Sequence, residues 1–419
     1  MLQNRSLSQD SHIKRKVSMS TMRLLSWAIF ITVGGWIGWN GWHYFFDKQN
    51  PIVAVVGVVD KGYYAGDVSC FVNGCHPYKV GKISIFLDGN PLVYNYSISK
   101  KQFEHPFNLN TRTLSNGKHA LVVKATDGTY YKNSAQEEYS FTVDNTPLQA
   151  AFIDQDGEKK VFQGRTLYVQ FQVNKPLKDA KINVFSKQYD CFKEGKNSLI
   201  YEAFVPVECE ENPTEYPFVI NCIDVVDNVV TLEGKAQVVQ FPFKRQKITV
   251  SEDKMKLEKA LSSEEDLNQK LADLAEQSPK EKLWQGSFFA PTEIGTVFTD
   301  FGVLRTTPDR GLYVHKAVDI GSMPKSVVWA PQAGKVIVKD RFTYSGNTVV
   351  IDHGCGIFSL LFHLDSIQDD IQVGKVVQKG NKVGTLGKTG YANGYHLHWE
   401  MRINNTPVDP MQWIKPNLA

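Results

Sequence analysis

Histidines and an acidic residue gather in the last third of this 419-residue chain. Imidazole nitrogens and carboxylate oxygens are common zinc ligands, and a catalytic zinc keeps one coordination position open. Five of the chain's ten histidines lie there together with Asp319, namely His315, His353, His363, His396 and His398. The clustering predicts a metal site that does chemistry rather than a set of core residues.

The clearest motif is a pair of histidines two residues apart. His396 and His398 follow a glycine-rich turn and lie in a short alternating apolar stretch. On a β-strand, residues two apart share a face, so we expect both imidazoles on one side and Leu397 and Trp399 on the other. Two such imidazoles can share a metal, or one can bind it while the other handles protons. The spacing leaves both arrangements open.

A second motif places His315 four residues before Asp319. The segment is rich in glycine and β-branched residues and poor in helix formers, so we expect a curled loop that enters a strand. His363 follows in a later apolar stretch. Each of these histidines alone would more often be a strand or surface residue. Only their combination with the paired histidines indicates a site.

Three neighbouring residues are expected to support the site rather than to do its chemistry. His353 follows a strand in a turn, where we expect it to pack or hydrogen-bond beneath the site. Cys355 lies between two glycines and fits a tight loop better than a nucleophile or a ligand. Glu400 is placed to accept a hydrogen bond from a ligand histidine and so to orient its ring.

In these motifs the chain resembles the lysostaphin or LytM-type zinc endopeptidases, which cut peptide bonds in bacterial peptidoglycan. The likeness runs from roughly residue 289 to residue 413. Further motifs follow in the family's order, at residues 298–302, 327–330, 333–336, 347–354, 363–364, 373–374, 383–384, 387–390 and 408–410. Agreement over this many ordered elements is hard to obtain by chance.

The resemblance implies a role for each residue of the cluster. His315, Asp319 and His398 would bind zinc (Zn2+), and His363 and His396 would stand over the open coordination position. Zinc lowers the pKa of a bound water from ~15.7 to about 7 and polarises the scissile carbonyl. The two free imidazoles would then act as general base and as stabiliser of the oxyanion, roles that the sequence does not divide between them.

Some positions depart from the family's pattern. Ala317 stands where the family usually has glycine, so either the loop avoids positive φ or its geometry is altered. Leu361 replaces a common tyrosine, and Ala392 and Asn393 replace a serine and a threonine. Because all five metal and catalytic positions are present, these changes bear on substrate preference more than on activity.

The N-terminus predicts a membrane anchor. Residues 24–46 form an apolar run with four tryptophans, and about 20 residues suffice to span a bilayer. Basic residues precede the run within residues 1–23, which favours a cytoplasmic N-terminus and an exported body. Bulky tryptophans occupy the zone where a small-residue cleavage site would lie, so we expect an uncleaved signal anchor. The predicted location is a bacterial cell envelope, with one pass through the inner or cytoplasmic membrane.

The middle of the chain has the texture of β-strands with Asp-Gly, Asn-Gly and Pro turns. We interpret residues 50–147 and 148–246 as two tandem immunoglobulin-like β-sandwiches. Cys70 and Cys75 are close enough in sequence for a small-loop disulfide. Cys191, Cys209 and Cys222 would leave one pair and an odd thiol in the second sandwich.

A helical linker is predicted at residues 251–280, ahead of a peptidase domain at residues 286–419. A capping-box pattern at Ser262 and Glu265 and a Ser-Pro stop bound the helix. Leucines recur at helical spacing, at positions 257, 261, 267, 271 and 274. This stripe must face something, and the catalytic domain is the expected partner. A self-associating coil and a segment over the active cleft stay open.

The fold class is therefore mainly β: a transmembrane helix, two immunoglobulin-like sandwiches, a linker helix and an antiparallel-β LytM-type peptidase domain. The formal charge of +3 and the lack of basic stretches interleaved with aromatics disfavour nucleic acid as a partner. The sequence thus predicts a membrane-anchored zinc metalloendopeptidase acting on peptidoglycan stem peptides or cross-bridges. Two alternatives stay open: a non-catalytic LytM-like wall-binding regulator of another hydrolase, and an envelope scaffold. Envelope proteins are a second class of partner that the sequence leaves open.

Overall fold

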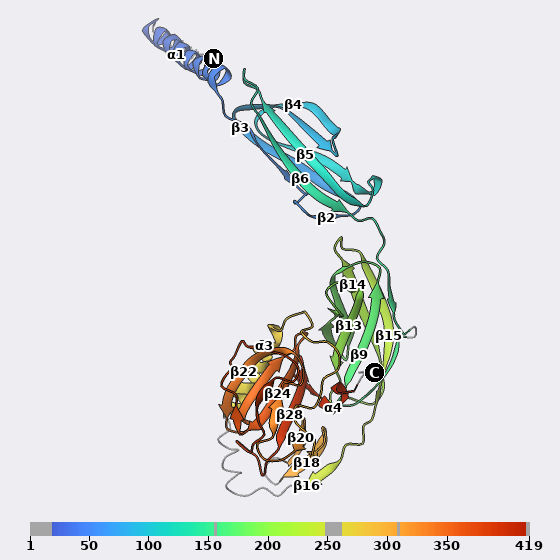
Figure 1. Ribbon diagram of the computed structural model, residues 1–419. Coiled ribbons are helices and arrows are strands. Elements are labelled where there is room, and N and C mark those ends of the chain that lie inside the picture. Colours follow the sequence, from blue (N-terminus) through green and yellow to red (C-terminus); the bar gives the residue numbers. More distant parts are fainter. Residues whose placement is uncertain (1–18, 155–156, 248–261, 308–310, 416–419) are drawn as a thin grey trace, which may run out of the picture. The chain divides into compact units, whose positions relative to one another are not determined.

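The computed structural model describes residues 19–154, 157–247, 262–307 and 311–415 (Figure 1). The described chain is mainly β, as the sequence predicts. It divides into two compact units, Met1–Thr146 and Pro147–Ala419. The helices used below are α1 (Met19–Phe46), α3 (Ser262–Glu276) and the short α4 (Pro410–Trp413).

Helix α1 opens the first unit. Its segment Met22–Phe46 is the one helix, within the described ranges, that is long and apolar enough to cross a membrane. Most of its large apolar side chains are exposed, among them Trp27, Trp36 and Trp39. A helix with apolar side chains on every face needs an apolar environment, which the described residues of this unit do not provide.

The β part of the first unit, called the first β domain below, is one hydrogen-bonded sheet in the order β1-β3-β5-β6-β2, with β4 paired to β3. Its strands are β1 (Ile52–Val56), β2 (Tyr63–Tyr64), β3 (Asp67–Leu87), β4 (Asn90–Asn110), β5 (Gly117–Asp127) and β6 (Ser134–Val143). Every second residue of β5 from His119 to Asp127 is buried, as expected for a strand with one face on a core. The immunoglobulin-like assignment stays a prediction.

The expected disulfide between Cys70 and Cys75 is wrong. Both residues lie on β3, in continuous antiparallel register with β4. Five residues of extended strand separate their Cα atoms by about 16 Å, at ~3.3 Å per residue. A disulfide needs a Cα separation of roughly 4–7 Å. All six cysteines are free, so the pair expected in the second sandwich does not form either.

The second unit begins with a β-sandwich of two separate sheets. One sheet contains β11 (Lys187–Asp190), β10 (Leu177–Val184), β14 (Glu215–Asp224), β15 (Val229–Val239) and β8 (Glu158–Phe162). The other contains β12 (Phe192–Lys193), β13 (Ile200–Pro206), β9 (Thr166–Val173) and β7 (Ala150–Phe152). The two sheets enclose an apolar core that includes Val169, Phe171, Ile182 and Phe218.

The C-terminal region is built on an eight-stranded antiparallel sheet. Its strands are β17 (Thr296–Thr299), β20 (Val318–Gly321), β28 (Leu397–Ile403), β24 (Ile357–Leu364), β23 (Gly346–Asp352), β22 (Gly334–Phe342), β26 (Val376–Val377) and β29 (Thr406–Val408). Smaller sheets join β16 (Arg245–Lys247), β18 (Val303–Thr307) and β19 (Gly311–His315), and β21 (Val327–Trp329), β27 (Lys382–Thr385) and β25 (Ser366–Ile367). This architecture agrees with the predicted antiparallel-β peptidase fold.

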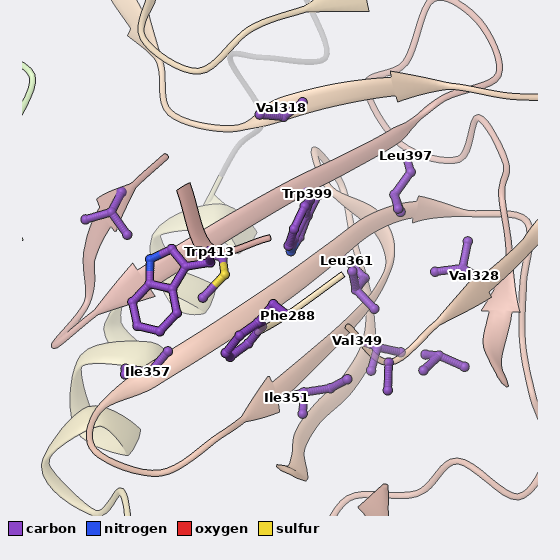
Figure 2. Close-up of a cluster of buried hydrophobic side chains, with 14 of the residues drawn as sticks. Phe288, Val318, Val328, Val349, Ile351, Ile357, Leu361, Leu397, Trp399 and Trp413 are labelled. Carbon is purple, nitrogen blue, oxygen red and sulfur yellow. The ribbon is translucent and has the colours of Figure 1, made fainter. Parts of the chain in front are cut away.

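Every residue of β24 and β28 is buried, because both faces of the sheet are covered. Figure 2 shows Leu361 and Trp399 on one face, in a cluster with Phe288 and Trp413. Helix α3 covers part of the other face.

Helix α3 ends at Glu276, before the end predicted for the linker helix of residues 251–280. Leu257 and Leu261 of the leucine stripe lie outside the described residues, as does the start of the predicted helix. Leu267 and Leu271 are fully buried and pack on the sheet, in a cluster with Val338, Val350, Phe358, Leu360 and Phe362. The predicted packing of the stripe on the catalytic domain is therefore confirmed for these two leucines.

The second sandwich and the C-terminal region share a core. Gln412 of α4 donates a hydrogen bond to the carbonyl of Thr166 and accepts one from its amide, and Trp413 donates to the hydroxyl of Thr166. The ring of Trp413 also packs on Phe204 of β13, at 5.6 Å between centroids. The second sandwich and the C-terminal region therefore belong to one compact unit, and the predicted boundaries between residues 148–246, 251–280 and 286–419 divide the sequence of that unit.

Candidate metal centre

Three strands bring the predicted metal ligands together. His315 ends β19, and after a bend of two residues Asp319 lies on β20. His398 lies on β28, directly opposite Asp319 in the antiparallel pair β20–β28. The predicted loop is shorter than expected, because residues 311–315 form strand β19 and only residues 316 and 317 form the bend that enters β20. Ala317, in the bend, is buried and does not have a positive φ, so this loop needs no glycine.

The three side chains are close enough to hold one ion. Their ligand atoms all lie within 4.8 Å of one another. His398 Nδ1 is 2.9 Å from Asp319 Oδ1, and His315 Nε2 is 3.2 Å from Asp319 Oδ2. His315 Nε2 is buried but makes no hydrogen bond of good geometry. A buried nitrogen and a buried carboxylate that face each other without a well-formed hydrogen bond are costly unless a cation lies between them.

The donor set fits Zn2+. Two imidazole nitrogens and one carboxylate oxygen form a three-ligand site of the catalytic type, with room for a fourth ligand. Burial alone would raise the pKa of Asp319, but contacts with His315 and His398 hold it well below its usual range. The carboxylate is therefore ionised and available as a ligand at neutral pH.

The other two predicted residues lie beside this cluster. His396 Nε2 is 3.8 Å from Asp319 Oδ1, so His396 and His398 point to the same side, as the strand spacing predicts. His363 packs against both, with ring centroids 4.8 Å from His396 and 5.7 Å from His398. The structure thus brings all five residues together.

Backbone carbonyls fix the tautomers of His363 and His396. His363 Nδ1 donates to the carbonyl of Thr389 at 2.9 Å, and His396 Nδ1 donates to that of Gly394 at 2.9 Å. A carbonyl oxygen only accepts, so each Nδ1 carries the proton and each Nε2 keeps its lone pair. Burial lowers the pKa of His396, and burial with positive charge on neighbouring histidines lowers that of His363 to about 3. Both rings are therefore neutral proton acceptors.

His363 is held in an unusual backbone conformation. Its φ is +61°, and the pairing of β24 with β23 shifts register near it. Its amide donates to the carbonyl of Ser345, so two loops clamp the residue, one at Ser345 and one at Thr389. Non-glycine residues with positive φ are uncommon, and such conformations persist where the surroundings enforce them, often at functional sites.

A buried chain of polar side chains supports His398 from behind. Its Nε2 donates to Glu400 Oε1 at 3.2 Å, which leaves Nδ1 for the metal. Arg402 holds the other oxygen of Glu400 at 2.7 Å and reaches Asn268 of α3 at 2.9 Å. Burial would raise the pKa of Glu400, but Arg402 and His398 lower it to about 2. This ionised carboxylate fixes the ring of His398, as the sequence suggested for Glu400 alone.

Arg305 is a site residue that sequence reasoning missed. Its guanidinium donates to Asp319 Oδ2 at 3.1 Å and to Thr299 Oγ1 at 2.7 Å. It lies on β18, opposite Tyr313 of β19, and only the pairing of these strands brings it to Asp319. Arg305 precedes Asp319 by 14 residues, and this spacing is not a sequence signal for contact between the two side chains.

His353 and Cys355 have the structural roles that the sequence predicts. His353 is fully buried, and its ring nitrogens bond to the carbonyl of Ala333 and the hydroxyl of Ser359. Cys355 lies in a tight loop at φ +57° with its thiol buried. Neither belongs to the described cluster that could hold an ion.

Known proteins match this part of the chain. Residues 313–410 match the model of Peptidase family M23. The peptidoglycan DD-endopeptidase ShyB of Vibrio cholerae is 34% identical over 117 residues, 28% of this chain and 27% of that protein. The DD-carboxypeptidase/endopeptidase Mpg of Neisseria meningitidis is 34% identical over 103 residues, 25% of this chain and 23% of that protein. A solved peptidase M23 of Pseudomonas aeruginosa is 21% identical, with 65% of this chain and 97% of that chain covered and a TM-score of 0.42.

The chain spans about a quarter of the length of the curated relatives it matches. Within that span, the predicted family resemblance is confirmed, and residues 313–410 form a peptidase M23 domain.

Proposed function

We propose that this protein is a membrane-anchored zinc metalloendopeptidase that hydrolyses peptide bonds in peptidoglycan stem peptides or cross-bridges. One observation carries the proposal: three buried ligand atoms within 4.8 Å of one another stand beside two imidazoles whose Nε2 atoms are free of protons. The family match supports it, as do relatives whose names describe peptidoglycan endopeptidases.

The ligands are His315 through Nε2, His398 through Nδ1 and Asp319 through a carboxylate oxygen. Zinc bound there would polarise the scissile carbonyl and acidify a water. Arg305 and Glu400 fix the orientation of Asp319 and His398 around it. The site is buried, so these charge interactions are stronger than they would be in bulk water.

His363 and His396 move the protons. As the water oxygen bonds to the carbonyl carbon, one Nε2 accepts the water's proton, and that proton passes to the amine as the C–N bond breaks. The second imidazole stabilises the negative charge on the carbonyl oxygen once its Nε2 carries a proton, because only an N–H donor attracts an oxyanion. Water and peptide are consumed, and one carboxylate and one ammonium group are formed, so the amine receives both protons of the water.

The remaining assignments complete the proposal. Helix α1 anchors the chain in the inner or cytoplasmic membrane of a bacterial envelope, with the peptidase on the exported side. Residues 50–147 and 148–246 are immunoglobulin-like spacers, and envelope proteins are further candidate partners.

The test uses full-length protein in nanodiscs, loaded with zinc and incubated with purified peptidoglycan of several cross-link types. Mass spectrometry of released fragments identifies the bond, and His396→Ala is run alongside. We expect one zinc per chain in both proteins and fragment release by the wild type alone. Wild-type protein that holds zinc but releases nothing from any wall type would overturn the enzyme in favour of a wall-binding regulator.

A further inference from the structure

The end of helix α1 is locked to the first β domain by a buried polar network. Asp47 bonds to His43 at 3.1 Å, and its backbone carbonyl accepts from Asn133 at 3.2 Å. Asn133 also donates to Asp127 at 2.7 Å, and His76 bonds to the carbonyl of Gln49 at 3.0 Å. Asp47, His76 and Asp127 are buried. A flexible linker would have a solvated backbone with few such bonds, so the helix and the β domain move together here.

The last turns of α1 reach the depth of the lipid headgroups. The helix has 28 residues and is therefore about 42 Å long at ~1.5 Å per residue. The hydrocarbon core of a bilayer is only about 30 Å thick. With the charged Arg23 at the opposite interface, about 20 residues of helix cross the core. The last turn then extends into the interfacial zone, where it carries exposed aromatic side chains, Trp42, Tyr44 and Phe45. Such residues are enriched at that level.

Loops of the first β domain stand level with these turns. The amide of Tyr130, in the turn between β5 and β6, donates to the carbonyl of Tyr44 at 2.8 Å. The ring of Phe45 is 6.1 Å from that of Tyr130, and the ring of Tyr44 is 6.3 Å from that of Tyr78. Tyr130 is 63% exposed and Tyr131 is 49% exposed. Aromatic side chains that the protein itself does not cover thus ring the point where the helix leaves the bilayer.

The charges around this ring are positive. Lys48 Nζ lies 5.6 Å over the ring of Tyr131, Lys79 Nζ lies 5.3 Å over that of Tyr78, and Lys132 is exposed in the same turn. The nearby carboxylates of Asp47 and Asp127 are buried in the polar network. The outward charge therefore complements anionic lipid headgroups.

We propose that this membrane collar, formed by Tyr44, Phe45, Tyr78, Tyr130 and Tyr131 with Lys48, Lys79 and Lys132, is a binding surface for the headgroup zone of an anionic bilayer. The inference rests on the proposed anchoring by α1 and is independent of the peptidase activity. The collar would hold the first β domain against the membrane surface in one orientation. Tyrosine rings and lysine stems are suited to this zone because each has an apolar body and a polar tip.

The test is oxidative footprinting of wild-type full-length protein in nanodiscs of phosphatidylcholine and phosphatidylglycerol. Tyr63 is the internal control, since it is 52% exposed and pairs with Thr142 at the opposite end of β6 from the collar. Eight residues of strand separate that end from Ser134, about 26 Å at ~3.3 Å per residue. We expect Tyr63 to be oxidised and Tyr130 and Tyr131 to be protected.

Equal oxidation of all three tyrosines in protein that elutes with the nanodiscs would overturn the collar and leave the anchor intact. Protein that does not elute with the nanodiscs would overturn the anchor, and the collar with it. A second arm uses the triple variant Lys48→Gln, Lys79→Gln, Lys132→Gln, which removes three positive charges. The readout is Tyr130, since Lys48 and Lys79 lie over the rings of Tyr131 and Tyr78 and their loss alone would uncover those rings. We expect Tyr130 to lose part of its protection, whereas unchanged protection would overturn the anionic headgroup as the ligand.

Discussion

The two halves of the candidate site are positioned by different means. Asp319 and His398 lie opposite each other on regular paired strands, and side chains behind them fix their orientation. His363 lies where the strand register shifts, His396 lies in an isolated β-bridge with Gly387, and backbone carbonyls fix both rings. The ligand half, Asp319 and His398, depends on strand pairing and on the polar side chains behind it. The proton-handling half, His363 and His396, depends on loop conformation. Variants should therefore separate metal binding from turnover.

The largest effects come from removing one residue of each half. His398→Ala removes a ligand, so we expect loss of stoichiometric zinc and of all wall hydrolysis. His363→Ala leaves the three ligands intact, so we expect one zinc per chain and a drop in turnover of about 10²–10⁴-fold, the usual contribution of a general base. Zinc content by elemental analysis and fragment release by mass spectrometry measure both. Loss of zinc from His363→Ala would show that the two halves do not separate metal binding from turnover.

A glycine of the loop clamp tests the proton-handling half more finely. Gly390 has φ +72°, and an added Cβ would lie 2.3 Å from the carbonyl oxygen of Tyr344. Gly390→Ala should therefore shift the loop that holds His363, with a loss of turnover of up to about 10²-fold and no loss of zinc. Gly394→Ala in the same loop is the control, since nothing lies within 4 Å of its Cβ position. Equal activities of the two variants would argue against the clamp.

The chain behind His398 tests the ligand half. Arg402→Leu removes the partner of Glu400, and we expect a loss of zinc affinity of about 10–100-fold, typical of groups that orient a metal ligand. Asn268→Ala should also lower zinc affinity, but by a smaller factor, because it removes only one hydrogen bond to Arg402. Gln269→Ala, the next residue of α3, should leave affinity unchanged. Competition with a fluorescent zinc chelator gives the values, and wild-type affinity in Arg402→Leu would contradict the supporting role.

His353 lies outside both halves, and its protonation should have a smaller effect, on the stability of the fold. His353 and His398 are both buried. Burial lowers the pKa of His353 to about 4. Burial would also lower the pKa of His398, but its hydrogen bonds to Asp319 and Glu400 raise that pKa to about 9. The unfolded chain binds a proton at His353 near pH 6.5, and the folded chain does not until about pH 4. Stability is therefore lost as the pH falls from 6.5 towards 4, by about 2 kcal/mol between pH 7 and pH 5.

His353→Gln removes this titration. Urea unfolding at pH 7 and pH 5 should show a smaller difference in unfolding free energy for the variant than for the wild type. The same pH difference in both proteins would show that other groups cause the acid sensitivity.

Strand periodicity and motif order were sufficient to predict that these five side chains lie together, while their roles stay predictions. The spacing of His396 and His398 determines their shared face once the segment is a strand, and the resemblance supplied their partners. Arg305 and Asn268 could not be predicted, because they reach the site from β18 and α3 through tertiary packing. Cys70 and Cys75 illustrate the opposite error: closeness in sequence suggested a bridge, and the extended backbone of β3 holds the two apart.

The most direct test of the account is anomalous diffraction at the zinc edge from crystals of the full chain. We expect one zinc at ~2.0–2.2 Å from His315 Nε2, His398 Nδ1 and an oxygen of Asp319. His363 and His396 should face its remaining position without binding it. A zinc bound through the Nε2 atom of His398, or held at any other place in the chain, would contradict the arrangement on which the proposed chemistry depends.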